Sequence, residues 1–455
     1  MDAAGHSIRI AYIGGQPRRI NERVIDGQWI SYLEEHTETV RIPPLSLLKL
    51  FGGAEKVWLS RFPHSLDSLA EGLEGLCLKY RVDTVYMNLP TLLPYLLMAR
   101  SYAGLNIGFV FLAHSVGSES WLRQWIFNAP FLSDKDTLLA ATRTSKQALL
   151  HLSPRYGAAE CIPLSTKLPG DAAFGPIFEG RRGDHLLSIG RLEEVKNIHV
   201  LLECFARMRE RLPRLRLTVA GEYTGSSEQI ETYRATLESI VLRHRLEESV
   251  AFVGPVDGET KEELFRSSDL LINLSTDPGE TFGFNLLEAK AKGLPIVCTS
   301  WDGFQELVND GEDGFLVPVD WEEGTPQIDE TKTVERCLQL LEDAGLRRTL
   351  ASRSYESAQA FDYRRHFPDI IRAAAVRSRR DIVAMPDAVK LAETRLCDLP
   401  SFYELDRLRE LPFYQDSLLS IVSGNNSIMT DPAQWMPFAK PVIHHFAGRG
   451  EHAKL

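Results

Sequence analysis

The chain has 455 residues, of which 44% are hydrophobic and 25% charged. This length allows two or three domains, and the composition excludes a mainly disordered or fibrous protein. The 51 basic and 62 acidic residues leave a net charge of −11, which argues against a broad nucleic-acid-binding surface because phosphate backbones attract clustered cations. The six cysteines are scattered, without CxxC pairs or metal-ligand spacing. We therefore expect a reducing cytoplasmic location and no metal site.

Neither a secretory signal nor a membrane span is expected. Residues Met1–Ser7 lack the basic and then apolar layout of a signal peptide. The most apolar run, Leu89–Met98, is interrupted by Pro90 and Pro94 and is shorter than the roughly 18–20 residues of a spanning helix. Peripheral contact with a membrane stays open.

Short β-branched runs alternate with amphipathic stretches in the first part of the chain, which is typical of βα units on a parallel sheet. The predicted buried strands are Ile8–Ile13, Thr84–Asn88, Ile107–Ala113 and Thr137–Thr142. A Pro/Gly-rich stretch, Pro163–Arg182, then interrupts the pattern. It is the best candidate for an interdomain linker.

A second βα series follows at once. Its predicted strands are His185–Ile189, Leu215–Ala220, Val250–Gly254, Leu270–Leu274 and Pro295–Thr299, and its first helices are Asn197–Arg211, Glu228–His244 and Lys261–Arg266. In the first helix, apolar residues recur at i, i+3, i+4 and i+7 and form one face that must pack against a sheet: Ile198, Leu201, Leu202 and Phe205. Two such series predict an α/β protein with two Rossmann-like domains that face each other across a cleft, with ligands at the carboxyl ends of the strands.

The last residues, Asp381–Leu455, lose this rhythm but are rich in aromatic residues and prolines. We expect this extension to pack on the body of the protein or to mediate homo-oligomerisation. The alternative is a partly disordered extension with two short helices, near Phe402–Leu411 and Gln415–Ser423.

The segment Asp277–Gly293, DPGETFGFNLLEAKAKG, is the most informative for function. Asp277-Pro278-Gly279 has the composition of a turn, and a helix is predicted to begin near Thr281–Gly283 and to end at Gly293. Glu280 then lies at the helix mouth and Glu288 about two turns inside. Free backbone amides of Phe282–Leu286 would offer a diphosphate site, with Gly283 allowing close approach. From the residues alone, the pattern is equally compatible with structural roles, in which Glu280 caps the helix and Glu288 lies on its solvated face.

A second cluster follows the strand His185–Ile189. Arg191 and Lys196 lie where that strand ends and the next helix begins, so the two cations could flank phosphate charge without a metal. Alone, this cluster is also compatible with two solvated side chains.

Together, in this order and spacing, these segments resemble the retaining nucleotide-sugar glycosyltransferases of family 4, which have the GT-B architecture. The resemblance extends over about residues 8–375 and is strongest in the second half. It also includes Val250–Val256, Gly293–Val297, Gly311–Val317, Phe111–His114 and Gly14-Gly15. It implies an N-terminal acceptor domain over 1–165, a donor domain over 183–360, a helix crossing back over 361–380 and the extension over 381–455.

The resemblance also implies residue roles. The implied catalytic residues are Glu280, which holds the donor sugar, His114, which approaches that sugar, and Arg191 and Lys196, which neutralise the diphosphate. Glu288 is implied to bind the ribose, and the remaining implied substrate-binding residues are Gly14, Gly15, Val256, Phe282, Gly283, Phe284, Asn285 and Leu286. No cofactor is implied, because the nucleotide sugar, such as a UDP- or GDP-hexose, is a substrate.

Two segments depart from the family pattern. Gly221-Glu222-Tyr223 stands where the family commonly has Gly-x-Gly, so contacts with the nucleotide base are expected to differ. The loop after the first strand, GGQPRRINE, carries Arg18 and Arg19, which either meet an anionic substrate or are solvated.

The sequence therefore predicts a metal-independent retaining hexosyltransferase with a sugar, lipid-linked or small-molecule acceptor. The alternatives are an inactive scaffold on the same fold and a sugar-nucleotide epimerase, which would need a carboxylate pair as acid and base. A phosphorylase would need a lysine for pyridoxal phosphate. A dehydrogenase is disfavoured because Gly14-Gly15 is not followed by a GxGxxG pattern.

Overall fold

In the computed structural model, the described residues are 9–13, 30, 33–42, 65–88, 90, 93–113, 115–116, 121, 124–125, 128–165, 168, 181–277, 279–280, 282–322, 325–366 and 368–370. They fall into two compact units, which are described separately. Unit 1 holds the residues up to 165 together with 363–370, and unit 2 holds 168–362. The extension 381–455 lies outside the described residues. Within the described part, no helix has the length and apolarity needed to cross a bilayer.

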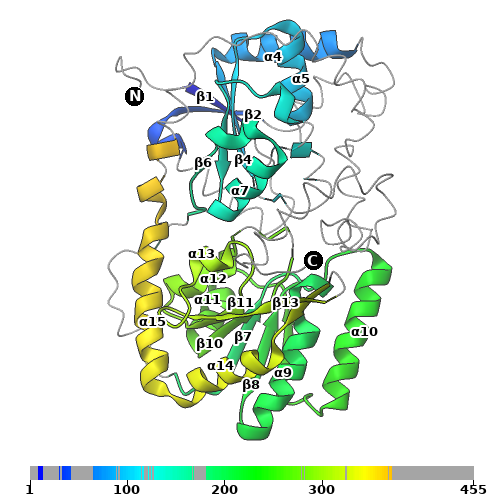
Figure 1. The fold of residues 1–455 in the computed structure, drawn as a ribbon, viewed down its shortest axis with the longest axis vertical. Helices are drawn as coiled ribbons and strands as arrows, with labels where there is room; N and C mark the ends of the chain where they lie inside the picture. Colours follow the sequence, from blue (N-terminus) through cyan, green and yellow to red (C-terminus); the bar gives the residue numbers. More distant parts are fainter. Residues whose placement is uncertain are drawn as a thin grey trace. The chain divides into compact units, whose positions relative to one another are not determined.

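Unit 1 is built on a six-stranded parallel sheet in the order β2-β1-β3-β4-β5-β6 (Figure 1). The strands are β1 Arg9–Ile13, β2 Glu38–Ile42, β3 Thr84–Met87, β4 Gly108–Ala113, β5 Thr137–Ala140 and β6 Glu160–Cys161. The helices are α4 Ser65–Tyr80, α5 Leu93–Ala103 and α7 Arg143–Leu152, with 3₁₀ turns η2 Ala129–Phe131 and η3 Pro154–Ala158. The four predicted strands are confirmed, and β2 and β6 were not predicted.

A buried ion pair joins helix α5 to the loop before β5 in unit 1. The Arg100 guanidinium donates to Asp136 Oδ2 at 2.7 Å and to the Phe131 carbonyl at 2.8 Å, and both charged side chains are almost fully buried. Residues 363–366 and 368–370 are helical, and the Tyr363 hydroxyl lies 3.2 Å from a carboxylate oxygen of Glu35. The chain therefore returns to unit 1 after unit 2 is complete.

Unit 2 has a second six-stranded parallel sheet, in the order β12-β11-β10-β7-β8-β9. The strands are β7 His185–Ile189, β8 Arg216–Ala220, β9 Val250–Gly254, β10 Leu270–Asn273, β11 Ile296–Thr299 and β12 Phe315–Val317. A small antiparallel hairpin, β13 Val319–Glu322 and β14 Thr325–Ile328, follows. The five predicted strands are confirmed, whereas β12 and the hairpin were not predicted. Both units are therefore Rossmann-like, as the resemblance implied.

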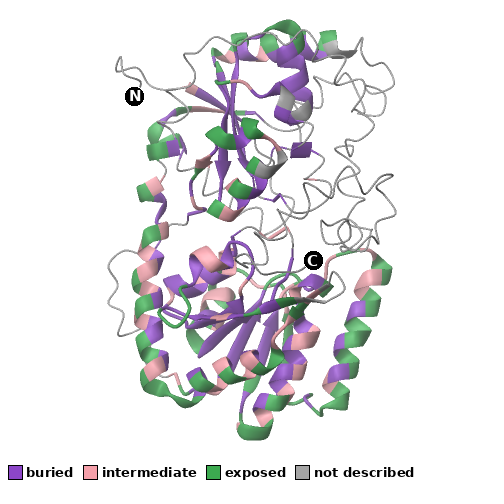
Figure 2. Ribbon diagram, in the orientation of Figure 1, coloured by how far each residue is buried: buried purple, intermediate pink, exposed green. Residues whose placement is uncertain are grey.

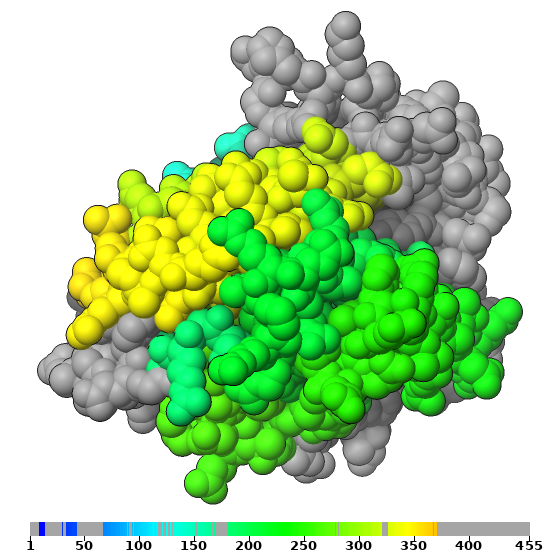
Figure 3. Space-filling view, turned by 90° about the horizontal axis from the view of Figure 1, so that it is seen from below, coloured from blue at the N-terminus to red at the C-terminus, as the bar shows by residue number. Residues whose placement is uncertain are grey.

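Helices cover both faces of the second sheet (Figure 1). They are α9 Ile198–Arg211, α10 Ser227–Arg243, α11 Gly258–Ser267, α12 Phe284–Ala291, α13 Phe304–Leu307, α14 Glu330–Glu342 and α15 Ala344–Ala358, with η4 Glu194–Lys196 and η5 Gln359–Phe361. Figure 3 shows α14 and α15, in yellow, beside α9 and α10, in green. Figure 2 shows the central strands buried and the outward helix faces exposed.

The predicted apolar face of α9 forms part of the main core of unit 2. Ile198, Leu201, Leu202 and Phe205 are all buried, and they pack with residues of α10 and α14 against β7, β8 and β10. The stripe was therefore predicted correctly, and burial of such a stripe is what holds a short helix on a sheet.

The loop between β11 and α13 contains a strained, buried acid. Asp302 has a left-handed backbone, with φ of 35°, and its side chain is fully buried. Neither carboxylate oxygen has a hydrogen-bond partner within the described part of the chain. Burial raises the pKa of Asp302 well above its ordinary value, and the nearby carboxylates of Glu306, Glu280 and Asp277 raise it further.

We predict that Asp302 makes the free energy of unfolding of the wild-type chain fall as the pH rises. When the pKa of a carboxyl is higher in the folded than in the unfolded chain, the neutral carboxyl contributes its full stabilisation at a pH below the unfolded-state pKa, which is near 4. This contribution is lost as the pH rises toward the folded-state pKa. The asparagine of Asp302→Asn cannot ionise. The free energy of unfolding of this variant, minus that of the wild type, should therefore increase by about 1.4 kcal/mol for each pH unit across that window. Urea denaturation between pH 5 and 8 measures the difference.

The matched control is Asp257→Asn, because Asp257 is exposed and makes no side-chain capping bond with α11. It reports the effect of the same substitution at an exposed site. A free-energy difference between Asp302→Asn and the wild type that varies with pH no more than that of the control would show that the Asp302 carboxyl is not neutral in the folded chain.

Candidate functional site

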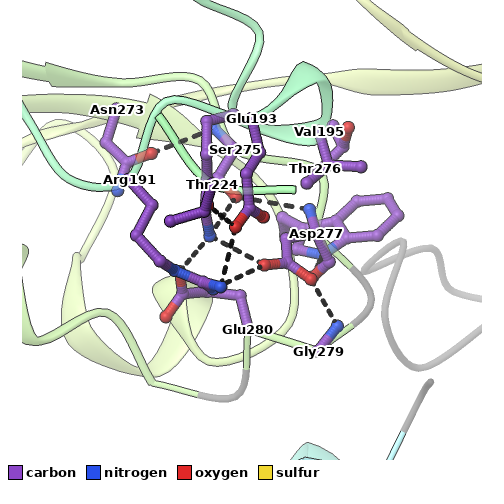
Figure 4. A network of polar contacts seen from close by, with 12 residues as sticks. Arg191, Glu193, Val195, Thr224, Asn273, Ser275, Thr276, Asp277, Gly279 and Glu280 are labelled. Carbon is purple, nitrogen blue, oxygen red and sulfur yellow. Dashed lines mark hydrogen bonds and ion pairs between the residues drawn. The ribbon is translucent and has the colours of Figure 1, made fainter. Parts of the chain in front are cut away.

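The candidate site lies where β7 and β10 end. These strands are neighbours in the sheet, but the connection after β7 leads through α9 to β8 on one side, and that after β10 leads through α12 to β11 on the other. Such a reversal of strand order opens a crevice at the carboxyl ends of the strands, where ligands of open α/β sheets bind. Polar side chains from both segments gather there (Figure 4).

Lys196 is the centre of this cluster. It ends η4, and its ammonium lies 2.8 Å from Asp277 Oδ2 and 2.8 Å from Glu280 Oε2, with Ser275 Oγ at 3.3 Å. Burial lowers the pKa of Lys196, but Asp277 and Glu280 outweigh burial and raise it to about 12. The ammonium is therefore charged at any physiological pH.

Arg191 approaches the same carboxylate from the end of β7 (Figure 4). One guanidinium nitrogen lies 2.9 Å from Glu193 Oε1, and the other lies 3.5 Å from Asp277 Oδ2. The Thr224 hydroxyl also donates to Glu193. The Arg191 side chain is 44% exposed, so this cation remains open to a ligand while its orientation is fixed by two carboxylates.

Every polar group of Asp277, in its side chain and its backbone, has a hydrogen-bond partner. Its Oδ1 accepts from the Gly279 amide at 2.7 Å, its own amide donates to Ser275 Oγ at 3.3 Å, and its carbonyl accepts from the Trp301 indole at 2.8 Å. Burial alone would raise the pKa of Asp277, but Lys196 and Arg191 outweigh it and hold this pKa below its ordinary value. Asp277 is thus a fixed anion between the two cations.

Asn197 connects the two strand ends behind the cluster. It adopts the left-handed conformation, with φ of 55°, which asparagine tolerates better than most residues. Its side-chain amide donates to the Leu274 carbonyl and to Thr276 Oγ1, both at 2.9 Å, and the Thr276 amide donates to the Val195 carbonyl at 2.9 Å. These bonds fix Lys196 relative to the segment that carries Asp277.

The start of α12 lies close to the predicted position, but not all of its backbone amides are free. The helix begins at Phe284, the residue after the predicted start near Thr281–Gly283, and Gly283 precedes it with φ of 88°. A Cβ at Gly283 would lie 2.6 Å from the Phe304 ring, so packing by itself requires glycine here. The expectation of a free amide is wrong for Leu286, whose N–H donates to the Gly283 carbonyl at 3.0 Å.

The side chains at this helix start have structural contacts. Phe282 is buried, with its ring edge-to-face against Phe284 at 5.6 Å and Phe361 at 5.8 Å between centroids. Asn285 donates to the Ile189 carbonyl at 2.6 Å and accepts from Asn273 at 3.2 Å. Asn285 therefore fixes α12 to the ends of β7 and β10. Because Phe282 is buried, its backbone amide is the group with which it would contact a ligand.

Glu288 lies little more than one turn inside α12, not two as expected, because the helix begins at Phe284. Its Oε1 lies 2.5 Å from the ammonium of Lys261 on α11. Lys261 was not identified from the sequence. The pair orients the Glu288 carboxylate, whose predicted role at the ribose remains a prediction.

Several predicted residues are not placed beside this cluster. His114, Gly14, Gly15, Arg18 and Arg19 lie outside the described residues, as does Thr281. Val256 lies between β9 and α11, beyond the edge strand of the sheet, and makes no described contact with Lys196 or Arg191.

Sequence reasoning missed two of the three carboxylates that hold the cations, Glu193 and Asp277. Asp277 was interpreted as a turn residue of an Asp-Pro-Gly sequence, and the Gly279 amide does donate to its Oδ1 in that way. The available signal was the placement of Asp277 just after a buried strand, where the sheet reverses strand order.

Comparisons with known proteins agree with this geometry. Residues 179–356 match the family model described as glycosyl transferases group 1. Over 184 residues the chain is 29% identical to phosphatidyl-myo-inositol mannosyltransferase of Mycobacterium tuberculosis, covering 40% of this chain and 44% of the relative. Over 192 residues it is 31% identical to D-inositol 3-phosphate glycosyltransferase of Pseudarthrobacter chlorophenolicus, covering 40% and 43%. The chain thus matches less than half the length of these curated relatives.

Solved structures extend the likeness in fold to most of the chain. A glycosyltransferase from Rickettsia africae has a TM-score of 0.62 at 16% identity, covering 82% of this chain and 99% of that one. Anabaena HepE in complex with UDP and glucose has a TM-score of 0.60 at 20% identity, covering 81% of this chain and 100% of that one. The cluster of Arg191, Lys196 and Glu280 thus lies in a unit whose sequence matches glycosyl transferases group 1, within a fold shared with glycosyltransferases.

Proposed function

We propose that this chain is a retaining glycosyltransferase that transfers a hexose from a nucleoside diphosphate to an acceptor hydroxyl without a metal ion. The observation that carries the proposal is that Arg191 and Lys196 share Asp277 at the ends of β7 and β10, and that Lys196 also pairs with Glu280. Two fixed cations can stabilise the charge that develops on a departing diphosphate. The family match of residues 179–356, which include all four residues, supports the assignment.

The proposed reaction needs positioning and stabilisation of the leaving group. The bond between the anomeric carbon and the diphosphate oxygen breaks while the acceptor hydroxyl attacks from the same face. The acceptor proton passes to a phosphate oxygen, so no strong protein base is required. In this scheme Arg191 and Lys196 bind the diphosphate, Glu280 holds sugar hydroxyls, and Glu288 accepts from the ribose.

The acceptor and the setting are further parts of the proposal. Two relatives are named for phosphatidyl-myo-inositol and for D-inositol 3-phosphate, so inositol phosphates and inositol lipids are the first acceptors to test. We propose that unit 1 binds the acceptor in the cytoplasm, with peripheral membrane contact if the acceptor is a lipid. Self-association through 381–455 remains a proposal of the same kind.

The first experiment is a thermal-shift series with UDP, GDP and ADP, followed by incubation with UDP- and GDP-hexoses and mass spectrometry of the products. A ligand at 100 times its Kd stabilises the folded chain by about 2.7 kcal/mol. No stabilisation by any nucleotide would favour the scaffold alternative over the enzyme.

Glu280→Gln should lower kcat by about a hundredfold, because oriented polar groups at a reacting centre contribute effects of that order. It should not weaken binding of the nucleoside diphosphate, since Glu280 is assigned to the sugar. Steady-state kinetics with the donor found above measures both. Turnover at the wild-type level would contradict the assignment of Glu280.

Glu288→Ala should weaken nucleotide binding by about 1–3 kcal/mol through loss of charge-assisted hydrogen bonds to the ribose. Titration calorimetry with the nucleoside diphosphate measures the change. Lys261→Met is the matched control, because it removes the ion pair with Glu288 but keeps the carboxylate. Equal losses in the two variants would show that the ion pair, rather than a ribose contact, is responsible.

Arg191→Ala and Lys196→Ala should each reduce kcat, and added Mg²⁺ should restore part of the loss in each variant by supplying positive charge at the diphosphate. The wild-type chain should keep its activity in excess EDTA. Loss of wild-type activity on chelation, with recovery on adding a divalent metal, would overturn metal independence.

A further inference from the structure

The two carboxylates that share Lys196 are held very differently. Asp277 has a side chain that is 3% exposed, and Lys196, Arg191 and the Gly279 amide all contact its carboxylate. The Glu280 side chain is 24% exposed, and Lys196 is the only partner of its carboxylate within the described part of the chain. Asp277 is therefore a permanent partner of Lys196, and Glu280 is a replaceable one.

The donor positions of Lys196 are all in use. An ammonium has three N–H groups, and Asp277, Glu280 and Ser275 lie within 3.3 Å of the nitrogen. A phosphate oxygen can bind Lys196 only by taking the place of one of these. Replacing Glu280 breaks the fewest other bonds and returns a partly exposed carboxylate to water or to another donor.

Charge leads to the same conclusion. Arg191 and Lys196 meet three carboxylates, those of Glu193, Asp277 and Glu280, which leaves one negative charge in excess. A diphosphate that entered this arrangement would meet repulsion. If Glu280 moves away from Lys196, one carboxylate fewer lies beside the cations that face the phosphates.

We propose that Asp277 is a positioning residue that holds Lys196 and Arg191 ready for the diphosphate, and that binding of the diphosphate displaces Glu280 from Lys196. This inference rests on the proposed function and extends it, because the displaced Glu280 carboxylate becomes free to accept from the sugar hydroxyls. The sugar contact then forms only when the diphosphate is in place.

The exchange of Glu280 for a diphosphate oxygen at Lys196 is tested by calorimetric titration. The ligand is whichever of UDP, GDP and ADP binds the wild-type chain best. Glu280→Gln removes the charge that competes for Lys196, so it should bind the nucleoside diphosphate about tenfold more tightly, equivalent to about 1.4 kcal/mol. The corresponding nucleoside without phosphates should bind both proteins equally. Glu194→Gln is the matched control, because Glu194 is exposed, is two residues from Lys196 and makes no described contact with it.

Asp277→Asn tests the positioning role separately. It should keep or tighten diphosphate binding, because one negative charge is lost, yet lower kcat about a hundredfold, because a small displacement of a catalytic group has effects of that size. If Asp277→Asn loses binding and thermal stability together, its role is structural only. Because Glu280 is partly exposed, Glu280→Gln should fold normally and carries the test if Asp277→Asn does not fold.

The outcomes separate the two proposals. If the wild-type chain binds none of the three nucleotides, the proposed function fails and the inference with it. If the wild type binds and Glu280→Gln binds no more tightly than Glu194→Gln, the exchange is overturned while the proposed function stands.

Discussion

One ammonium group shared between two carboxylates determines how the candidate site of this protein is arranged. Lys196 comes from the segment after β7, and Asp277 and Glu280 come from the segment after β10. The ion pair therefore joins the two strands at the point where the sheet reverses its order. A buried lysine is tolerated only with such partners, since a charge without them is strongly disfavoured in the interior. The same requirement fixes the position of the cation that a diphosphate would meet.

The surrounding contacts make this arrangement rigid where it is buried and leave it open where it is exposed. Asn197 binds the backbone carbonyl of Leu274, and Trp301 binds the carbonyl of Asp277 itself, so the segment that carries Asp277 is held from two sides of the sheet end. Arg191 and Glu280, by contrast, keep part of their side chains in contact with solvent. In the proposed binding step the cations stay in place and one carboxylate rearranges, which would keep the reorganisation on binding small.

The sequence predicted the buried elements of the fold and the cations of the site, but not their partners. Strands such as β7 and β10 were predicted because both of their faces are buried and their residues are mostly apolar. The edge strand β2 was missed because Glu38–Ile42 is mostly polar and only partly buried. Asp277 was missed because its importance depends on a contact between segments. Lys196 and Asp277 are 81 positions apart.

Asp302 shows that the site also imposes a requirement on the loop beneath it. A left-handed backbone at a residue other than glycine and two buried oxygens without described partners are both unfavourable, and such features persist mainly where the surrounding structure enforces them. Here Trp301, the preceding residue, donates to the Asp277 carbonyl, and Phe304, two residues later, packs against Gly283. The loop must therefore satisfy two contacts that position Asp277 and the start of α12. The backbone between them is left in the conformation that strains Asp302, so part of the stability of unit 2 is given up to hold the cluster in place.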